Sequence, residues 1–187
     1  MPSLRIRWEE RRRKMNRKWG TVYLYTGEGA GKTTNALGLA LRCLGHGYKV
    51  VIIQFLKWWK NTGEYKFRER FIPNYQIYQF GRRGWVGLKN LDERDKRLSV
   101  KALRFAKKIV WEKPRLLVLD EINLALDCKL LDVEDVIEFL KTVPKRTSVV
   151  LTGRRAPREL VVFADFVNEI IDVKHPDVIP TDKGIQY

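Results

Sequence analysis

The sequence is poor in cysteine and has no long apolar run, and both shortages restrict what the chain can be. Its two cysteines, Cys43 and Cys128, lie far apart in apolar, helix-like surroundings, and neither belongs to a CxxC pair. We therefore expect free, buried thiols in a reducing compartment, which suits a cytoplasmic enzyme. No stretch of about 18 apolar residues is present to span a membrane. The basic segment 1–18 is not followed by the apolar core of a secretory signal.

Acidic residues are the second shortage. The chain has 22 Asp and Glu against 37 Lys and Arg, which gives a formal net charge of +15. One explanation is a surface that binds nucleic acid or another polyanion, and the other is a charged surface of the thermophile kind. The basic residues are spread along the chain, with one dense patch at 5–18. We therefore favour a general surface property, and nucleic-acid binding is the weaker explanation.

Internal repeats and low-complexity linkers are also absent from the sequence. The 187 residues are enough for one domain with its own core, and 44% hydrophobic with 32% charged residues excludes wholesale disorder. We divide the chain into a basic N-terminal helical arm, 1–19, and a nucleotide-binding domain, 20–187.

Apolar runs typical of strands alternate with helical patterns along this domain. The expected strands are 21–25, 50–55, 76–80, 116–119, 148–152 and 166–173. The expected helices are 33–44, 91–111, one that Asp132 caps and that runs to Lys141, and 157–164. This alternation predicts an α/β fold, a mainly parallel sheet with helices on both faces. Such folds bind ligands at the carboxyl ends of their strands.

A glycine-rich loop follows the first expected strand. Its closely spaced glycines let backbone N–H groups converge on phosphate oxygens, because no Cβ blocks the approach. The helix that follows starts at Lys32, so its positive dipole end adds to the site. Lys32 supplies a mobile charge for phosphates, and Thr33 offers a hydroxyl to Mg²⁺. The usual P-loop has its first glycine where this chain has Thr26, so this loop is one residue short.

Charged residues end two further strands at the same edge of the expected sheet. Asp120 and Glu121 follow an apolar run in a Walker B arrangement, which places carboxylates where they can hold Mg²⁺ or its waters. Arg154 and Arg155 follow the strand 148–152, and a guanidinium can fork onto phosphate. Ordinary surface arginines are the alternative for this second pair.

Aromatic and basic residues gather in two segments, 54–60 and 80–85. They include Trp58, Trp59, Phe80 and Trp85. If exposed, these rings would form a flat binding surface, and if packed beneath a loop they would be structural. The sequence favours neither alternative.

In combination these motifs resemble the P-loop ATP:corrinoid adenosyltransferases of the cobalamin pathway. The short loop Gly-x-Gly-x-Gly-Lys-Thr-Thr carries the resemblance first. It continues, in the family's order, through the segments 36–42, 45–50, 54–57, 119–122, 151–157, 164–165, 174–176 and 184–187. The family usually has a Gly-x-Gly-Phe-x-Trp segment where this chain has Gly81-Arg-Arg-Gly-Trp85, so the corrinoid half of the site departs more from the pattern.

The resemblance implies a RecA-like fold, a homodimer, and transfer of the 5′-deoxyadenosyl group of ATP to the Co(I) of a corrinoid, with release of triphosphate. A reductase would supply the electron that converts Co(II) to Co(I), and Mg²⁺ would accompany ATP. Two alternatives remain: a RecA-like ATPase or nucleotide-binding module acting on nucleic acid, and a P-loop kinase of a small metabolite.

The resemblance also assigns roles to residues. The implied catalytic residues are Lys32, Thr33 and Glu121, and the implied magnesium neighbours are Thr33, Asp120 and Glu121. Aromatic residues near Gly81 would exclude the lower axial ligand of the corrinoid. The residues assigned to the corrinoid are Phe80, Trp85 and the basic residue Lys57. The implied nucleotide contacts are Gly27, Gly29, Ala30, Gly31, Lys32, Thr33, Thr34, Arg42 and Arg154.

Overall fold

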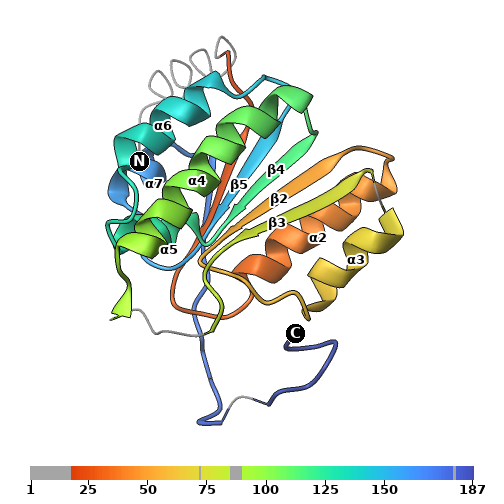
Figure 1. The fold of residues 1–187 in the computed structure, drawn as a ribbon, viewed down its shortest axis with the longest axis vertical. Coiled ribbons are helices and arrows are strands. Elements are labelled where there is room, and N and C mark those ends of the chain that lie inside the picture. Colours follow the sequence, from red (N-terminus) through yellow and green to blue (C-terminus); the bar gives the residue numbers. More distant parts are fainter. Residues whose placement is uncertain (1–17, 72, 85–89, 179) are drawn as a thin grey trace, which may run out of the picture.

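A single sheet of six parallel strands forms the centre of the molecule in the computed structural model, which describes residues 18–71, 73–84, 90–178 and 180–187 (Figure 1). The strand order is β3-β2-β4-β5-β1-β6. The strands are β1 (Val22–Thr26), β2 (Val50–Phe55), β3 (Tyr75–Phe80), β4 (Leu116–Asp120), β5 (Ser148–Thr152) and β6 (Phe166–Glu169). The predicted α/β fold with a parallel sheet is confirmed.

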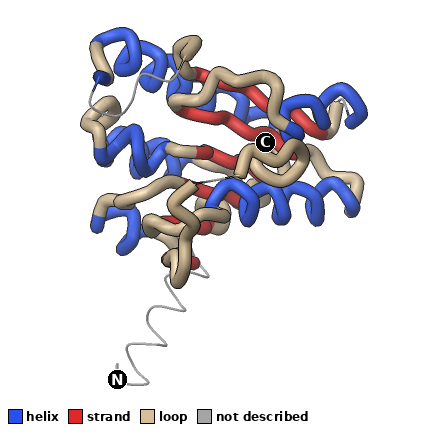
Figure 2. Tube along the Cα trace, turned by 90° about the horizontal axis from the view of Figure 1, so that it is seen from below, coloured by secondary structure: helices blue, strands red, loops and turns tan. Residues whose placement is uncertain are grey.

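Helices cover both faces of this sheet, so each face has its own apolar core (Figures 1 and 2). On one face lie α2 (Lys32–Gly45) and α3 (Gly63–Phe71), and Ala36 and Ala40 pack against Val50 and Ile52. The larger core on the other face includes Phe139. The helices on that face are α4 (Glu93–Ile109), α5 (Ile122–Asp127), α6 (Val133–Thr142) and α7 (Arg158–Phe163).

The start of α4 is fixed by a capping box. The side chain of Asp92 accepts a hydrogen bond from Arg94 N (2.8 Å), and that of Asp95 accepts one from Asp92 N (3.0 Å). These bonds satisfy N–H groups that a helix start leaves without partners, so the helix begins later than the predicted 91–111. It also ends earlier, because the chain tightens into the 3₁₀ turn η2 (Val110–Glu112).

Three details of the predicted elements were wrong. The last strand was expected to reach residue 173, but β6 ends at Glu169 because the chain then turns towards the glycine loop, where Ile170 N donates to Thr26 O (2.8 Å). Asp132 occupies the N-cap of α6 without a side-chain capping bond. Helices α3 and α5 were not predicted.

The described chain begins at the end of the predicted N-terminal arm, whose residues 1–17 lie outside the described part. Trp19 forms an isolated antiparallel bridge with Pro144, and its ring stacks on Phe163 with 5.7 Å between centroids. The last residue of the arm segment is therefore attached to the domain near α7.

Both cysteines are free, as expected, but each is only partly buried. Burial raises the pKa of both thiols. Within the described ranges, no helix combines the length and apolar character needed to cross a membrane.

Candidate functional site

The glycine loop lies between β1 and α2, at the carboxyl ends of the strands. Gly31 is the N-cap of α2 and has a φ of 106°, a left-handed conformation that glycine adopts without a steric penalty. Gly27 and Gly29 are needed for a second reason. A Cβ at Gly27 would lie 2.3 Å from Ile170 O, and one at Gly29 would lie 2.8 Å from the same atom. The glycines thus allow the segment after β6 to pack directly against the loop.

Hydrogen bonds from this segment hold the loop in place. Gly29 N donates to Ile170 O (2.9 Å), and Ala30 N donates to Asp172 Oδ1 (3.1 Å). The last strand and the residues after it therefore support a loop more than 130 residues earlier in the chain. No local sequence pattern predicts this contact.

Lys32 folds back over the loop that precedes it. Its Nζ donates to the carbonyl oxygen of Gly27 (2.8 Å) and to that of Gly29. Burial lowers the pKa of Lys32, an effect that the negative charge of Glu121 opposes. The loop therefore surrounds one largely buried ammonium group.

Asp120, at the end of β4, is the centre of a polar cluster at the sheet edge. It is fully buried and accepts four hydrogen bonds. Thr33 Oγ1 (2.9 Å) and Thr152 Oγ1 (2.7 Å) donate to Oδ1, while Gln54 Nε2 (3.0 Å) and Lys57 Nζ (2.7 Å) donate to Oδ2. Burial alone would raise the pKa of Asp120, but the charge of Lys57 and these bonds hold it below the usual range. Lys57 and these hydrogen bonds therefore favour the ionised form of Asp120.

Lys57 lies among the acidic residues of this cluster. Its Nζ also donates to Thr33 Oγ1 (3.1 Å) and lies 4.0 Å from Glu121 Oε1. Burial would lower its pKa, but Asp120 and Glu121 outweigh that effect and raise it. Sequence reasoning assigned Lys57 to the corrinoid. The structure places its ammonium group beside the predicted magnesium ligands, so the corrinoid contact stays a prediction.

Glu121 has a backbone conformation that is rare for its residue type. Its φ is 64°, in the left-handed region, and its N–H donates to Thr152 Oγ1 (3.0 Å). Burial raises the pKa of Glu121, Lys57 opposes the rise, and Asp120 adds to it. Strained residues of this kind cluster at functional sites, which is consistent with the predicted role of Glu121.

The predicted arginines divide between two places. Arg154 pairs with Glu28 of the glycine loop (3.5 Å between Nη1 and Oε2), so the structure brings it to the loop. Arg42 lies in the last turn of α2, about 15 Å from Lys32 along the helix axis. It lines a separate cavity of about 200 Å³, and Tyr48 lines the same cavity. Arg42 is therefore not brought to the loop.

Two of the described aromatic residues, Phe80 and Trp59, lie in different surroundings. Phe80 packs against Phe105 of α4, with 5.5 Å between ring centroids. Trp59 is 41% exposed, and its ring lies 4.8 Å from that of Tyr187, the last residue of the sequence. Figure 2 shows this end of the chain in front of the sheet when the molecule is seen from below. Trp85 lies outside the described residues.

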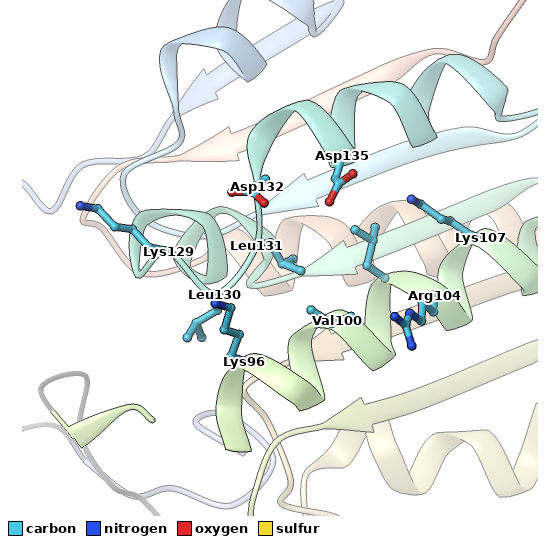
Figure 3. Close-up of a pocket in the computed structure, with 10 residues that line it drawn as sticks. Lys96, Val100, Arg104, Lys107, Lys129, Leu130, Leu131, Asp132 and Asp135 are labelled. Atoms are coloured by element: carbon cyan, nitrogen blue, oxygen red, sulfur yellow. The ribbon is translucent and has the colours of Figure 1, made fainter. Parts of the chain in front are cut away.

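Another cavity lies apart from these residues. It has a volume of about 330 Å³ and lies between α4 and the segment that leads into α6 (Figure 3). Its walls carry basic side chains such as Lys96 and Arg104, with Asp132 and Asp135 opposite. None of the residues that the sequence assigned to a site lines it.

Sequence reasoning missed several residues that organise the site. Gln54 and Thr152 bond Asp120 directly, and Gln79 Nε2 donates to Gln54 Oε1 (2.9 Å). Asn123 Nδ2 donates to Tyr25 O (3.2 Å) and to the carbonyl of the glycine after Thr152 (3.1 Å). The only available signal was position, because polar residues at or beyond the carboxyl ends of parallel strands meet at one edge.

Among solved structures, the fold is similar to that of the flagellar accessory protein FlaH from Methanocaldococcus jannaschii. The TM-score is 0.54 at 13% sequence identity, covering 86% of this chain and 75% of FlaH. At this identity the likeness shows the fold alone, and it agrees with the expected RecA-like arrangement.

Sequence comparisons identify relatives much more specifically. The chain is 35% identical to a corrinoid adenosyltransferase of Sinorhizobium sp., covering 90% of this chain and 80% of the relative. It is 33% identical to corrinoid adenosyltransferase CobA of Salmonella typhimurium (90% and 86%) and to a corrinoid adenosyltransferase of Pseudomonas aeruginosa (90% and 84%).

A family model described as ATP:corrinoid adenosyltransferase BtuR/CobO/CobP matches residues 18–187, almost the whole chain. The match does not favour the nucleic-acid alternative. The chain therefore belongs to the ATP:corrinoid adenosyltransferase family, and it is a transferase that moves the adenosyl group of ATP to a corrinoid.

Proposed function

We propose that the loop from Gly27 to Thr34 binds the triphosphate of ATP, and that Lys32, Thr33 and Glu121 act in adenosyl transfer. The hydrogen bond from Thr33 Oγ1 to Asp120 Oδ1 (2.9 Å) carries this proposal. It joins the start of α2 to the end of β4, so the hydroxyl that follows the loop lysine in the chain lies against the carboxylate of Asp120, with Glu121 next along the chain. A polyphosphate with a divalent cation requires this combination of groups.

Mg²⁺ is the cation that we propose at this point. The hydroxyl of Thr33 and the carboxylates of Asp120 and Glu121 are hard oxygen donors, and Mg²⁺ usually combines one or two carboxylates with substrate phosphates and water. Lys57 Nζ lies within 3.1 Å of Thr33 Oγ1 and 2.7 Å of Asp120 Oδ2, so these oxygens already accommodate positive charge. When bound, Mg²⁺ would neutralise part of the triphosphate charge.

The loop suits a triphosphate that leaves as a whole. Co(I) attacks C5′ of the ribose and the C5′–O bond breaks, so negative charge moves onto the triphosphate. Groups that bind this charge more tightly in the transition state accelerate the reaction. We assign that role to Lys32, Arg154 and the backbone N–H groups of Gly27, Gly29, Ala30, Gly31, Thr33 and Thr34. The N–H groups of Gly29 and Ala30, which here donate to Ile170 O and Asp172 Oδ1, would exchange these partners for phosphate oxygens.

For the corrinoid half of the site we propose Phe80, Trp85 and Lys57, with the basic arm 1–19 as a cover. Family membership supports three further proposals: a homodimer, a cytoplasmic location, and a reductase that supplies the electron for Co(II) reduction. The domain division at residues 19 and 20 belongs to the same set.

An anaerobic assay tests the nucleotide assignment. The protein is incubated with ATP, Mg²⁺ and chemically reduced cobalamin, and the light-sensitive adenosylated product is followed by absorption. Lys32→Ala should lower the rate by about 100-fold or more while the fold stays intact, because the positive charge that stabilises the leaving triphosphate is lost. Lys60→Ala, which removes an exposed lysine, should retain the wild-type rate. Full activity in Lys32→Ala would contradict the triphosphate assignment.

The same assay separates the role of Trp85. If its ring excludes the lower axial ligand, Trp85→Ala should slow adenosylation more when the reaction starts from Co(II) with a reductase than from Co(I). Equal losses from the two starting states would argue against ligand exclusion.

A further inference from the structure

Lys57 contacts the oxygen atoms that we assign to Mg²⁺. Its Nζ lies 2.7 Å from Asp120 Oδ2, 3.1 Å from Thr33 Oγ1 and 4.0 Å from Glu121 Oε1. We propose that Lys57 is a tethered cation that competes with the divalent metal for one position and gives it up to a metal–nucleotide complex. The inference rests on the metal assignment proposed above.

The burial of Asp120 explains why this position needs a positive charge at all times. The side chain of Asp120 is 1% exposed, and an ionised carboxylate removed from water is strongly destabilising unless a cation balances it. The hydrogen bonds from Thr33, Thr152 and Gln54 are dipolar and bring no net charge. The ammonium group of Lys57 supplies that charge.

Lys57 is also able to leave. Its side chain is 32% exposed, so part of it already faces water and a path away from Asp120 begins at the surface. A lysine is a compact point charge on a flexible stem, whereas an arginine would hold the carboxylate through a rigid fork. The residue type therefore suits a reversible contact better than a permanent one.

The backbone around Lys57 is built in a way that an ordinary surface ion pair does not require. Leu56 has a φ of 58°, in the left-handed region, which is strained for a residue with its side chain. A Cβ at Gly81 would lie 2.5 Å from Leu56 C and 2.6 Å from Lys57 N, so only glycine permits the approach of the two loops. Both features fix the point from which the side chain reaches Asp120.

Competition predicts how the metal reaches the site. A free divalent ion must displace the ammonium group of Lys57 and leaves it without a partner. A metal–nucleotide complex also brings phosphate oxygens, which accept the displaced ammonium group. The protein should therefore bind the metal poorly alone and well together with ATP.

Mn²⁺ binding without nucleotide, measured by electron paramagnetic resonance of the free ion, tests the proposal without any turnover. Lys57→Met should bind Mn²⁺ at least about tenfold more tightly than the wild type, because a neighbouring unit charge no longer repels the ion. Lys57→Arg keeps the charge and should bind as weakly as the wild type. Lys60→Met controls for the loss of one positive charge elsewhere on the surface.

Thermal unfolding gives a second readout. In EDTA, Lys57→Met should melt below the wild type, and Mn²⁺ should raise its melting temperature more than that of the wild type. If Lys57→Met cannot be purified, Lys57→Gln removes the charge and keeps a hydrogen-bond donor to Asp120.

Each outcome has a separate meaning. If the wild type binds Mn²⁺ with ATP, Asp120→Asn weakens that binding, and Lys57→Met shows no gain without ATP, the tethered-cation inference is wrong and the metal site stands. If Mn²⁺ binding with ATP is the same in the wild type and Asp120→Asn, the proposed metal site is wrong, and the inference falls with it.

Discussion

Gly81 is the residue at which the loops after β2 and β3 approach each other most closely. Gly81→Ala would place a Cβ 2.5 Å from Leu56 C, so the backbone that carries Lys57 must shift. We expect a loss of about 1–3 kcal/mol in stability from overpacking, measured by urea denaturation, together with a slower adenosylation rate. Gly38→Ala is the control. Gly38 lies in α2, and a Cβ at this position would meet nothing within 4 Å. Equal behaviour of the two variants would contradict the packing argument.

Thr152 connects the carboxylate of Asp120 to the backbone of Glu121 through one hydroxyl group. Its Oγ1 donates to Asp120 Oδ1 (2.7 Å) and accepts from Glu121 N (3.0 Å), and the residue is fully buried. Thr152→Val keeps the shape but removes one of the four hydrogen bonds to Asp120 and takes the acceptor from Glu121 N, so unfolding should become easier by about 1–3 kcal/mol. Thr152→Ser keeps the hydroxyl and should lose much less. Denaturation curves that coincide for the two variants would show that the hydroxyl has no such role.

At the scale of elements, the cap of α4 gives a prediction with a pH dependence. The backbone N–H of Arg94 and the charge of Arg82 hold the pKa of Asp92 below its usual range. A carboxyl group with a lowered pKa stabilises the fold above its ordinary pKa, and that contribution disappears as pH falls through the lowered value. Asp92→Ala should therefore be less stable than the wild type at neutral pH, and the difference should shrink in acid.

Urea denaturation at several pH values measures this effect. Asp92→Asn is the matched control, because asparagine is also a good N-cap but does not titrate in this range. A stability difference between Asp92→Ala and the wild type that persists unchanged in acid would contradict the assignment.

The helices and strands that were predicted correctly are those that their own local pattern of apolar residues is enough to identify. Val50–Phe55 is apolar except for Gln54 and buried along its whole length, and α2 has Ala36 and Ala40 on its inner side. Helix α3 escaped prediction because six of its nine residues are charged or glycine. Helix α5 begins directly after the strained Glu121, where no cap signal marks a start. The end of β6 depends on the glycine loop, a contact that no local pattern contains.

The residues of the candidate site also fall into two groups, those that a local motif identifies and those whose role depends on the fold. Lys32, Thr33 and Asp120 follow from motifs within short segments, and a hydrogen bond joins Thr33, the residue after Lys32, to Asp120. The contributions of Gln54 and Thr152 depend on β2 and β5 lying on either side of β4, which is a property of the strand order. Trp85 lies outside the described residues, so its assignment rests on the resemblance alone.

For the whole molecule, nucleotide binding should appear as added stability. A ligand that binds only the folded state at 100 times its dissociation constant contributes about 2.7 kcal/mol. For a chain of 187 residues this corresponds to a rise of about 5–10 °C in melting temperature. ATP with Mg²⁺ should give this shift in the wild type and a much smaller one in Lys32→Ala. A shift of the same size in both would place the nucleotide elsewhere.

The position of β1 in the sheet has a consequence for synthesis of the protein. β1 pairs with β5 and β6. Val22 and Tyr23 of β1 pair with Val149 of β5 and Phe166 of β6, which lie more than 120 residues further along the chain. Pairings of such high sequence separation form late, and domains emerge from the ribosome amino terminus first. The glycine loop is thus synthesised early but reaches its final structure last, when Ile170 becomes available to accept the hydrogen bond from Gly29. A nascent chain stalled before residue 148 would have every residue of the glycine motif but neither β5 nor β6, the two strands that pair with β1.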